Sequence, residues 1–197
     1  MRQHIWNVIL TALLLAPTMS LAGGGPGHGV VSYNDKPRPV ANLTQSPVPN
    51  PSYSAVFFDE SYPDDPAAKS PAQHLGVDIP VPSGSAVLSP VSGVLISNQT
   101  DPDDPWNSRV VIRAENGDEH VLGHINSSIK AQTSIDIGDP VGTILTAGSG
   151  PHLHWGVNTI GVQGAMGGGW GWGRAPVTTT LSEANKKGWI DPRSLLN

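Results

Sequence analysis

From residue 74 onward, short apolar runs alternate with turn residues along the chain. The runs are VDIPV, SAVLSPVSGVLIS, RVVIRA, EHVLGHI and DPVGTILTAG. Runs of this length, rich in Val and Ile and separated by Gly, Pro, Asn and Asp, are typical of β-strands. Several strands at this spacing predict a mainly β fold, built as a small antiparallel sheet or sandwich.

The strongest turn signal lies between RVVIRA and EHVLGHI. These runs are joined by ENGD, which contains Asn116 and Gly117, a pair favoured in tight hairpins. We therefore expect the two strands to pair with each other. A helical pattern occurs only near SEANKKG, residues 182–188, where Ser182 is a candidate cap and Gly188 a candidate end.

The first 22 residues have the pattern of a signal peptide. Arg2 precedes a mostly apolar run over residues 5–16, and small residues lead up to Ala22. The alternative is a membrane anchor, but a helix needs about 20 apolar residues to span a membrane, and this run is shorter. We expect cleavage after Ala22 and an exported protein, periplasmic or extracellular, with no membrane span left after cleavage.

Residues 23–69 lack a sustained period and are predicted to be a Gly/Pro-rich arm or pro-segment. Residues 53–73 are interpreted as a solvated loop, and the alternative is a lid over the domain that follows. If the acidic tract 59–65 covered a metal site, one of its carboxylates could inhibit the protein. Residues 70–197 are predicted to form the main domain.

Composition narrows the chemistry. The chain has no Cys, which excludes disulfides and thiolate metal sites, so any transition-metal site must use His, Asp or Glu. The net charge of −5, without a basic cluster, argues against nucleic acid as a partner. We expect a monomer.

Histidines occur at spacings that bring side chains together. His152 and His154 share one face of an extended segment, with Leu153 and Trp155 on the other. His74 and Asp78 share a face in a strand or in a helix. Each pair of side chains can therefore point into the same small space.

The strand end EHVLGHI holds two further histidines. His120, Leu122 and His124 have the same parity and are expected to share a face unless a bulge intervenes. A lone histidine is more often structural than catalytic, and we expect that of His28 and His120.

Two histidines and one aspartate satisfy the needs of a catalytic zinc site, which keeps three protein ligands and one open position. Additional imidazoles can then transfer protons or stabilise an oxyanion. A two-histidine, one-carboxylate iron site is the alternative. The His-x-x-x-Asp order and the extra histidine of HLH argue against iron.

Three motifs in order, HLGVD, LGHI and GPHLHWGV, resemble those of the lysostaphin-type zinc endopeptidases. That family shows H-x-x-x-D, a Y-x-H-like strand end and G-x-H-x-H. The likeness continues between the motifs, in PVPSGSAVLSPVSGVLIS and DIGDPVGTILTAGSGPHLH, and again in the tail WIDPRSLLN. It covers about residues 70–160, with the tail in addition.

The resemblance implies a role for each matching residue. His74, Asp78 and His154 match the ligands of one Zn²⁺ per chain, and His124 and His152 match the catalytic histidines that do not bind the metal. It also implies a small antiparallel β domain of the duplicated hybrid motif type with a narrow groove. The implied activity is hydrolysis of peptide bonds in peptidoglycan cross-links or stems, or in another Gly-rich peptide.

The sequence departs from the family pattern at two positions, one in the central motif and one just after HLH. Leu122 replaces a frequent Tyr, so a hydroxyl that could hydrogen-bond the transition state is missing. Gly156 replaces a frequent Glu, whereas Trp155 keeps the aromatic residue and is a candidate substrate contact.

The segment 161–175, GVQGAMGGGWGWGRA, matches nothing in the family pattern and is interpreted as an insertion. Trp170 and Trp172 would project on one side of an extended segment, where they could bind a glycan or a peptide. The alternative is local packing of both indoles. Arg174 is a candidate contact for a substrate carboxylate.

Two functional classes remain. One is an exported zinc endopeptidase, and the other is a non-catalytic domain of the same fold that binds cell wall or regulates other hydrolases. Inactive relatives typically lose metal ligands, and this chain keeps the three ligands and both catalytic histidines. The sequence therefore favours the enzyme.

Overall fold

The structure, a computed structural model, describes residues 44–58, 72–147, 150–161 and 171–196. Several predictions lie outside these described residues: the signal peptide with its cleavage after Ala22, the first part of the arm with His28, the acidic tract 59–65, and Trp170.

Strands dominate the described part of the chain. In chain order the elements are β1 (Ala72–His74), β2 (Val77–Pro80), β3 (Ala86–Leu88), β4 (Gly93–Gln99), β5 (Arg109–Ala114), β6 (Glu119–Gly123), β7 (Ile125–Asn126), β8 (Thr133–Ile135), β9 (Pro140–Ile144), β10 (Thr146–Ala147), β11 (Gly150–Asn158), β12 (Arg174–Pro176), α1 (Leu181–Lys186), β13 (Trp189–Ile190) and the 3-10 helix η2 (Pro192–Leu195).

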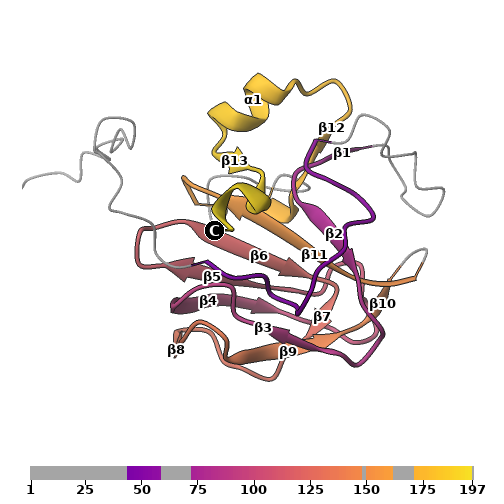
Figure 1. Cartoon of the computed structure of the whole chain (residues 1–197), viewed down its shortest axis with the longest axis vertical. Helices are drawn as coiled ribbons and strands as arrows, with labels where there is room; N and C mark the ends of the chain where they lie inside the picture. The colour runs from indigo at the N-terminus through magenta and orange to yellow at the C-terminus, as the bar shows by residue number, and fades with distance from the viewer. Residues whose placement is uncertain (1–43, 59–71, 148–149, 162–170, 197) are drawn as a thin grey trace, which may run out of the picture. The chain divides into compact units, whose positions relative to one another are not determined.

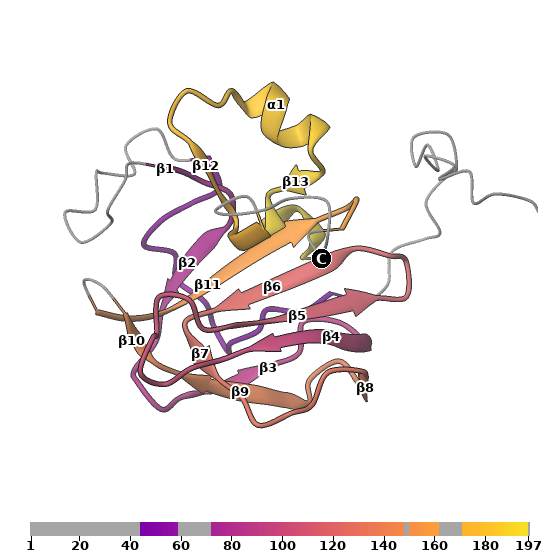
Figure 2. The same ribbon diagram turned by 180° about the vertical axis from the view of Figure 1, so that it is seen from behind.

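The largest sheet is organised around β11. Its strand order is β10-β11-β6-β5-β4-β8, and β2 and β13 also pair with β11. Figures 1 and 2 both show β11 running between β2 and β6. A second sheet has the order β3-β9-β7, and β1 pairs with β12 in a two-stranded ribbon. The pairs are antiparallel, which confirms the predicted mainly β, antiparallel fold.

The predicted hairpin is present. Strands β5 and β6 pair from Arg109 opposite Gly123 to Arg113 opposite Glu119. In the turn, Gly117 has a φ of 91°, a conformation that glycine adopts without strain. The Asn116 side chain accepts a hydrogen bond from the Asp118 backbone N–H at 3.0 Å. The local sequence thus fixes the register of two central strands.

Helix α1 begins slightly earlier than expected. Its cap is Thr180, which exchanges hydrogen bonds with Glu183 in a capping box, and so the predicted cap at Ser182 is wrong. Gly188, with a φ of 83°, follows the helix end as predicted.

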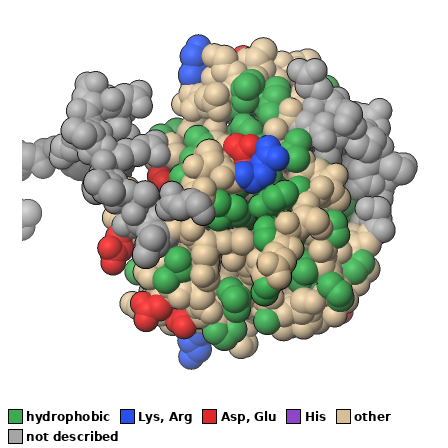
Figure 3. Space-filling view, in the orientation of Figure 1, with side chains coloured by type: hydrophobic (Ala, Val, Ile, Leu, Met, Phe, Trp, Pro, Cys, Tyr) green, Lys and Arg blue, Asp and Glu red, His purple; other side chains and the backbone are tan. Residues whose placement is uncertain are grey.

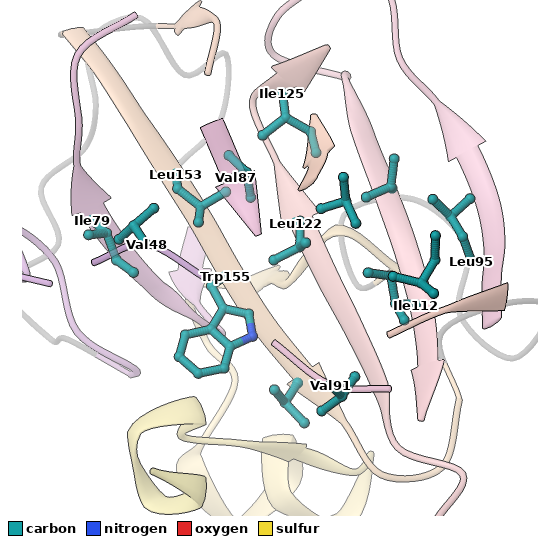
Figure 4. Close-up of a cluster of buried hydrophobic side chains, with 14 of the residues drawn as sticks. Val48, Ile79, Val87, Val91, Leu95, Ile112, Leu122, Ile125, Leu153 and Trp155 are labelled. Atoms are coloured by element: carbon teal, nitrogen blue, oxygen red, sulfur yellow. The ribbon is translucent and has the colours of Figure 1, made fainter. Parts of the chain in front are cut away.

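Alternation along β11 separates the core from the other face of the sheet. Leu153, Trp155 and Val157 are 0% exposed and belong to the main hydrophobic cluster. Figure 4 shows Leu153 and Trp155 projecting from β11 into this cluster beside Leu122. Trp155 therefore has no surface left for a substrate, and the predicted substrate contact at this residue is wrong. His152 and His154 are left for the opposite face.

Residues 44–58, here called the N-terminal strap, pack directly on the domain. Val48 is 2% exposed and belongs to the main cluster. Pro47 accepts a backbone hydrogen bond from Leu88, and Ala55 forms an isolated β-bridge with Asp78. This part of the predicted arm 23–69 therefore contributes to the core of the domain.

Neither helix in the described ranges is long and apolar enough to cross a membrane. Charged side chains are few and scattered on the face drawn in Figure 3, with hydrophobic and uncharged polar groups between them.

Candidate active site

Three strands bring a carboxylate and two imidazoles together. His74 ends β1, Asp78 lies in β2, and His154 lies in β11 directly opposite Asp78. The distance from His74 Nε2 to His154 Nδ1 is 2.9 Å, and each of these atoms lies 3.1 Å from Asp78 Oδ1. The three residues are 1%, 5% and 3% exposed. The predicted ligand set thus forms one buried cluster.

The donor atoms of this cluster fit a zinc ion. Ligands at the usual Zn–N and Zn–O distances, in a tetrahedron, stand about 3.3 Å apart, close to the separations observed. Burial lowers the pKa of His154 to about 4. Burial raises the pKa of Asp78, but the charge of His74 and hydrogen bonds from His154 and His74 outweigh it, so this pKa lies well below its usual value. Neutral imidazole and ionised carboxylate are the forms that bind metals.

The strap orients His74, the first of the predicted ligands. His74 Nδ1 lies 3.1 Å from the carbonyl oxygen of Val56. A carbonyl only accepts, so Nδ1 carries a proton and Nε2 is the nitrogen left for a metal ion. The Ser54 N–H donates to the Asp78 carbonyl, and the Asp78 N–H donates to the Ala55 carbonyl, both at 2.9 Å. The same short stretch of the strap therefore supports two ligands.

His124 turns out of its strand. Its φ of 61° follows the end of β6 and moves its side chain away from the face that His120 occupies. The His124 ring lies 4.5 Å from the His152 ring and 6.4 Å from the His154 ring, between centroids. Burial, aided by the charge of His152, lowers the pKa of His124 to about 3. The predicted catalytic histidine is thus beside the ligands.

His120 lies on the core side instead. Its ring stacks on Trp155 at 6.2 Å, and Trp155 Nε1 donates to His120 Nδ1 at 3.3 Å. The expectation that His120 and His124 share a face is wrong because of the left-handed residue. The structural role expected for His120 agrees with its burial.

His152 is the most open of the four histidines at the site. Its side chain is 14% exposed, and its Nε2 lies 3.9 Å from Asp78 Oδ2. Nδ1 lies 2.9 Å from the Gly150 carbonyl, so Nδ1 is the protonated nitrogen. The Nδ1 of His124 lies 3.0 Å from the Pro105 carbonyl in the same way. Both rings therefore keep Nε2 for chemistry.

Trp172 forms a wall of the site. Gly123 lies opposite His154 in the sheet, and a Cβ added at Gly123 would overlap the Trp172 ring. The ring centroid lies 5.9 Å from His154 and 5.2 Å from His124, and the residue is 7% exposed. The absence of a side chain at Gly123 makes room for the indole.

Three more residues complete the surroundings. Trp106 lies 5.4 Å from His124, and the Arg174 guanidinium covers the Trp106 ring at 5.0 Å. The Arg109 guanidinium covers Trp172 at 5.3 Å. Arg174 was among the predicted site residues, whereas Trp106 and Arg109 were missed. The hairpin register, which places Arg109 beside Gly123, was the signal that could have found Arg109.

Leu122 belongs to the core and not to the site. It is 0% exposed and packs in the main cluster. A hydroxyl at this position would face apolar side chains here.

A buried cluster of two histidines and one aspartate, flanked by two more histidines on an antiparallel sheet, can hold a metal ion with further imidazoles beside it. Residues 72–165 match the family model of Peptidase family M23, so this part of the chain is similar to that family.

Two solved structures with a similar fold illustrate the likeness. The catalytic domain of the prophage-encoded M23 protein EnpA from Enterococcus faecalis, solved as a point mutant, is 15% identical, with a TM-score of 0.50 over 71% of this chain and 98% of that one. Lysostaphin from Staphylococcus simulans is 16% identical, with a TM-score of 0.50 over 62% and 48% of the two chains.

Among curated proteins, the DD-carboxypeptidase/endopeptidase Mpg of Neisseria meningitidis is 30% identical over 84 residues. The match covers 42% of this chain and 19% of that protein, so it spans about a fifth of the relative's length. The Mpg protein of Neisseria gonorrhoeae matches to the same extent.

Proposed function

We propose that this protein is an exported zinc endopeptidase that hydrolyses peptide bonds in peptidoglycan cross-links or stems. The observation that carries the proposal is the convergence of His74, Asp78 and His154 within hydrogen-bonding distance, with His124 and His152 beside them. The match of residues 72–165 to the Peptidase family M23 model and the likeness to a relative named as a DD-carboxypeptidase/endopeptidase support it.

The ligand residues provide the electrostatic frame of the reaction. A bound zinc ion supplies a Lewis acid that lowers the pKa of a water molecule to about 7 and polarises a peptide carbonyl. Asp78 contributes the negative charge, and His74 and His154 contribute neutral nitrogens. Tight burial of all three excludes bulk water from the side of the site that the sheet covers.

His124 and His152 perform the proton transfers. Each holds its Nδ1 proton on a backbone carbonyl, so each offers Nε2 to a water or a substrate. His152 is the better placed to take a proton from the attacking water and to deliver it to the leaving amine, because its Nε2 lies near Asp78 Oδ2 and its side chain reaches solvent. His124, buried behind it, packs against the His152 ring and stabilises the developing oxyanion once its Nε2 has taken a proton during the reaction.

Digestion of purified peptidoglycan, with and without a chelator, tests the proposal. The zinc-loaded protein should release peptide fragments whose mass reports which bond was cut, and chelation should stop the release until zinc is restored. Binding to peptidoglycan without any release of fragments would favour the non-catalytic domain instead.

Export and the remaining substrate contacts belong to the same proposal. The signal peptide pattern supports a mature chain that begins at Gly23, which N-terminal sequencing of protein recovered outside the cytoplasm would check. Trp172 and Arg174 line the site and are proposed substrate contacts, together with Trp170.

A further inference from the structure

Two arginines flank the candidate active site, and strand register places both of them there. Arg174 in β12 lies directly opposite the ligand His74 in β1. Arg109 in β5 lies opposite Gly123 in β6, and Gly123 lies opposite the ligand His154 in β11. Directly opposed residues of an antiparallel pair project from the same face. Both arginines therefore start from the face that carries the ligands.

Each guanidinium rests on a tryptophan that also contacts His124. Arg109 Cζ lies 5.3 Å from the centroid of Trp172, and Arg174 Cζ lies 5.0 Å from that of Trp106. The Trp172 and Trp106 rings lie 5.2 and 5.4 Å from the His124 ring. Stacking on an aromatic ring holds a guanidinium in place and leaves its N–H edges available to a ligand.

Neither guanidinium forms an ion pair with a carboxylate of the described residues. The arginine pairs found in this part of the chain are Arg113 with Glu119 and Arg193 with Asp191. Arg109 and Arg174 are both partly buried, and burial lowers the pKa of Arg109. A partly dehydrated cation with no counter-charge among the described residues is suited to bind an anion.

We propose that Arg109 and Arg174 form a carboxylate-binding subsite next to His124, and that the preferred substrate carries a free carboxylate close to the bond that is hydrolysed. This inference rests on the proposed function, since it places a peptide across the histidines. A guanidinium binds a carboxylate through paired N–H donors, which fixes orientation as well as charge. A peptidoglycan stem peptide with an unblocked C-terminus has this chemistry.

The test compares a soluble stem peptide that has a free C-terminal carboxylate with the same peptide as its C-terminal amide. Binding of both to the zinc-loaded protein is measured by calorimetry, and their cleavage is followed in parallel. The wild type should bind the acid at least about tenfold more tightly than the amide, the effect of one charge-assisted contact. In the double variant R109Q/R174Q the ratio of the two affinities should fall to about one.

Arg113→Gln is the matched control, because Arg113 lies on the same strand as Arg109 but is already paired with Glu119. It should keep the wild-type ratio. A preference for the acid that survives in R109Q/R174Q, or equal binding of acid and amide by the wild type, overturns the subsite. Preferential binding of the acid without cleavage of either peptide keeps the subsite and overturns the proposed endopeptidase function.

Discussion

His152 and His154 stand two residues apart on β11 and face the same side, yet their surroundings differ. His154 is 3% exposed and its Nδ1 lies 3.1 Å from Asp78 Oδ1, whereas the nearest Asp78 oxygen to His152 Nε2 is 3.9 Å away. This difference agrees with the proposal that His154 is a metal ligand and that His152 acts beside the metal without binding it.

Substitution of each histidine should therefore have a distinct outcome. His154→Ala should lose zinc and activity together, because one of the three ligands disappears. His152→Ala and His124→Ala should keep near-stoichiometric zinc and lose activity by about 100- to 1000-fold, the usual cost of one group that acts in the transition state. Elemental analysis and peptidoglycan digestion of the same samples measure both. Loss of zinc from His152→Ala with retention in His154→Ala would reverse the assigned roles.

For single residues, the sequence predicted which residues meet better than it predicted which way their side chains point. The motifs identified His74, Asp78 and His154, and the structure brings them together. The direction of His124 depends on one left-handed backbone conformation, which a parity argument does not contain. Trp155 was misassigned because its place in a motif was given more weight than its alternation with His154, and that alternation already directs it to the core.

Among the elements, the N-terminal strap contributes both to the core and to the position of His74. It contributes Val48 to the core, and its Val56 carbonyl fixes the proton of His74. No local sequence pattern predicts these contacts of the strap, because the contacting residues are far apart along the chain. Val56 and His74, for example, are separated by 18 residues. By contrast, Thr180 and Glu183 formed a T-x-x-E capping signal that was visible in the sequence.

Truncation should distinguish the strap from the residues before it. A protein that begins at Thr44 should bind zinc as the full chain does. One that begins at Asp59 lacks the Val56 carbonyl, and its zinc affinity should fall by about 10- to 100-fold, the usual effect of losing a group that orients a ligand. Competition with a chromophoric chelator measures both affinities.

The shorter protein also loses Val48 from the core, so Val48→Ala in the full chain serves as the control for stability alone. It should unfold more easily in urea while the zinc affinity of the folded protein stays close to that of the wild type. Equal zinc affinities in the two truncated proteins would show that the strap does not orient His74.

For the whole molecule, acidification should lower the free energy of unfolding through His120, a residue outside the candidate site. Burial lowers the pKa of His120 to about 3. In the unfolded chain this histidine titrates near 6.5, so between these values the unfolded state binds a proton that the folded state does not. Stability should therefore fall as the pH drops from 6.5 toward 3, and the His120 share at pH 5 is about 2 kcal/mol.

His120→Gln removes this titration and keeps an acceptor for the Trp155 indole N–H. Urea unfolding at pH 8 and pH 5 should show a loss of stability on acidification that is about 2 kcal/mol smaller in His120→Gln than in the wild type. At pH 8 the titration of His120 does not contribute, so a difference between the two proteins at this pH reports a packing defect of the variant. If acidification destabilises both proteins equally, His120 is not a source of acid sensitivity.

The three histidines whose Nδ1 protons rest on the carbonyls of Val56, Pro105 and Gly150 have a consequence for protein engineering. The acceptors are main-chain atoms of three separate loops or segments, so no choice of side chains can recreate them on another scaffold. A graft that copies only the histidines and the aspartate onto a foreign β-sheet would leave the ring tautomers undefined. Transplanting this chemistry requires the course of the surrounding backbone as much as the residues of its motifs.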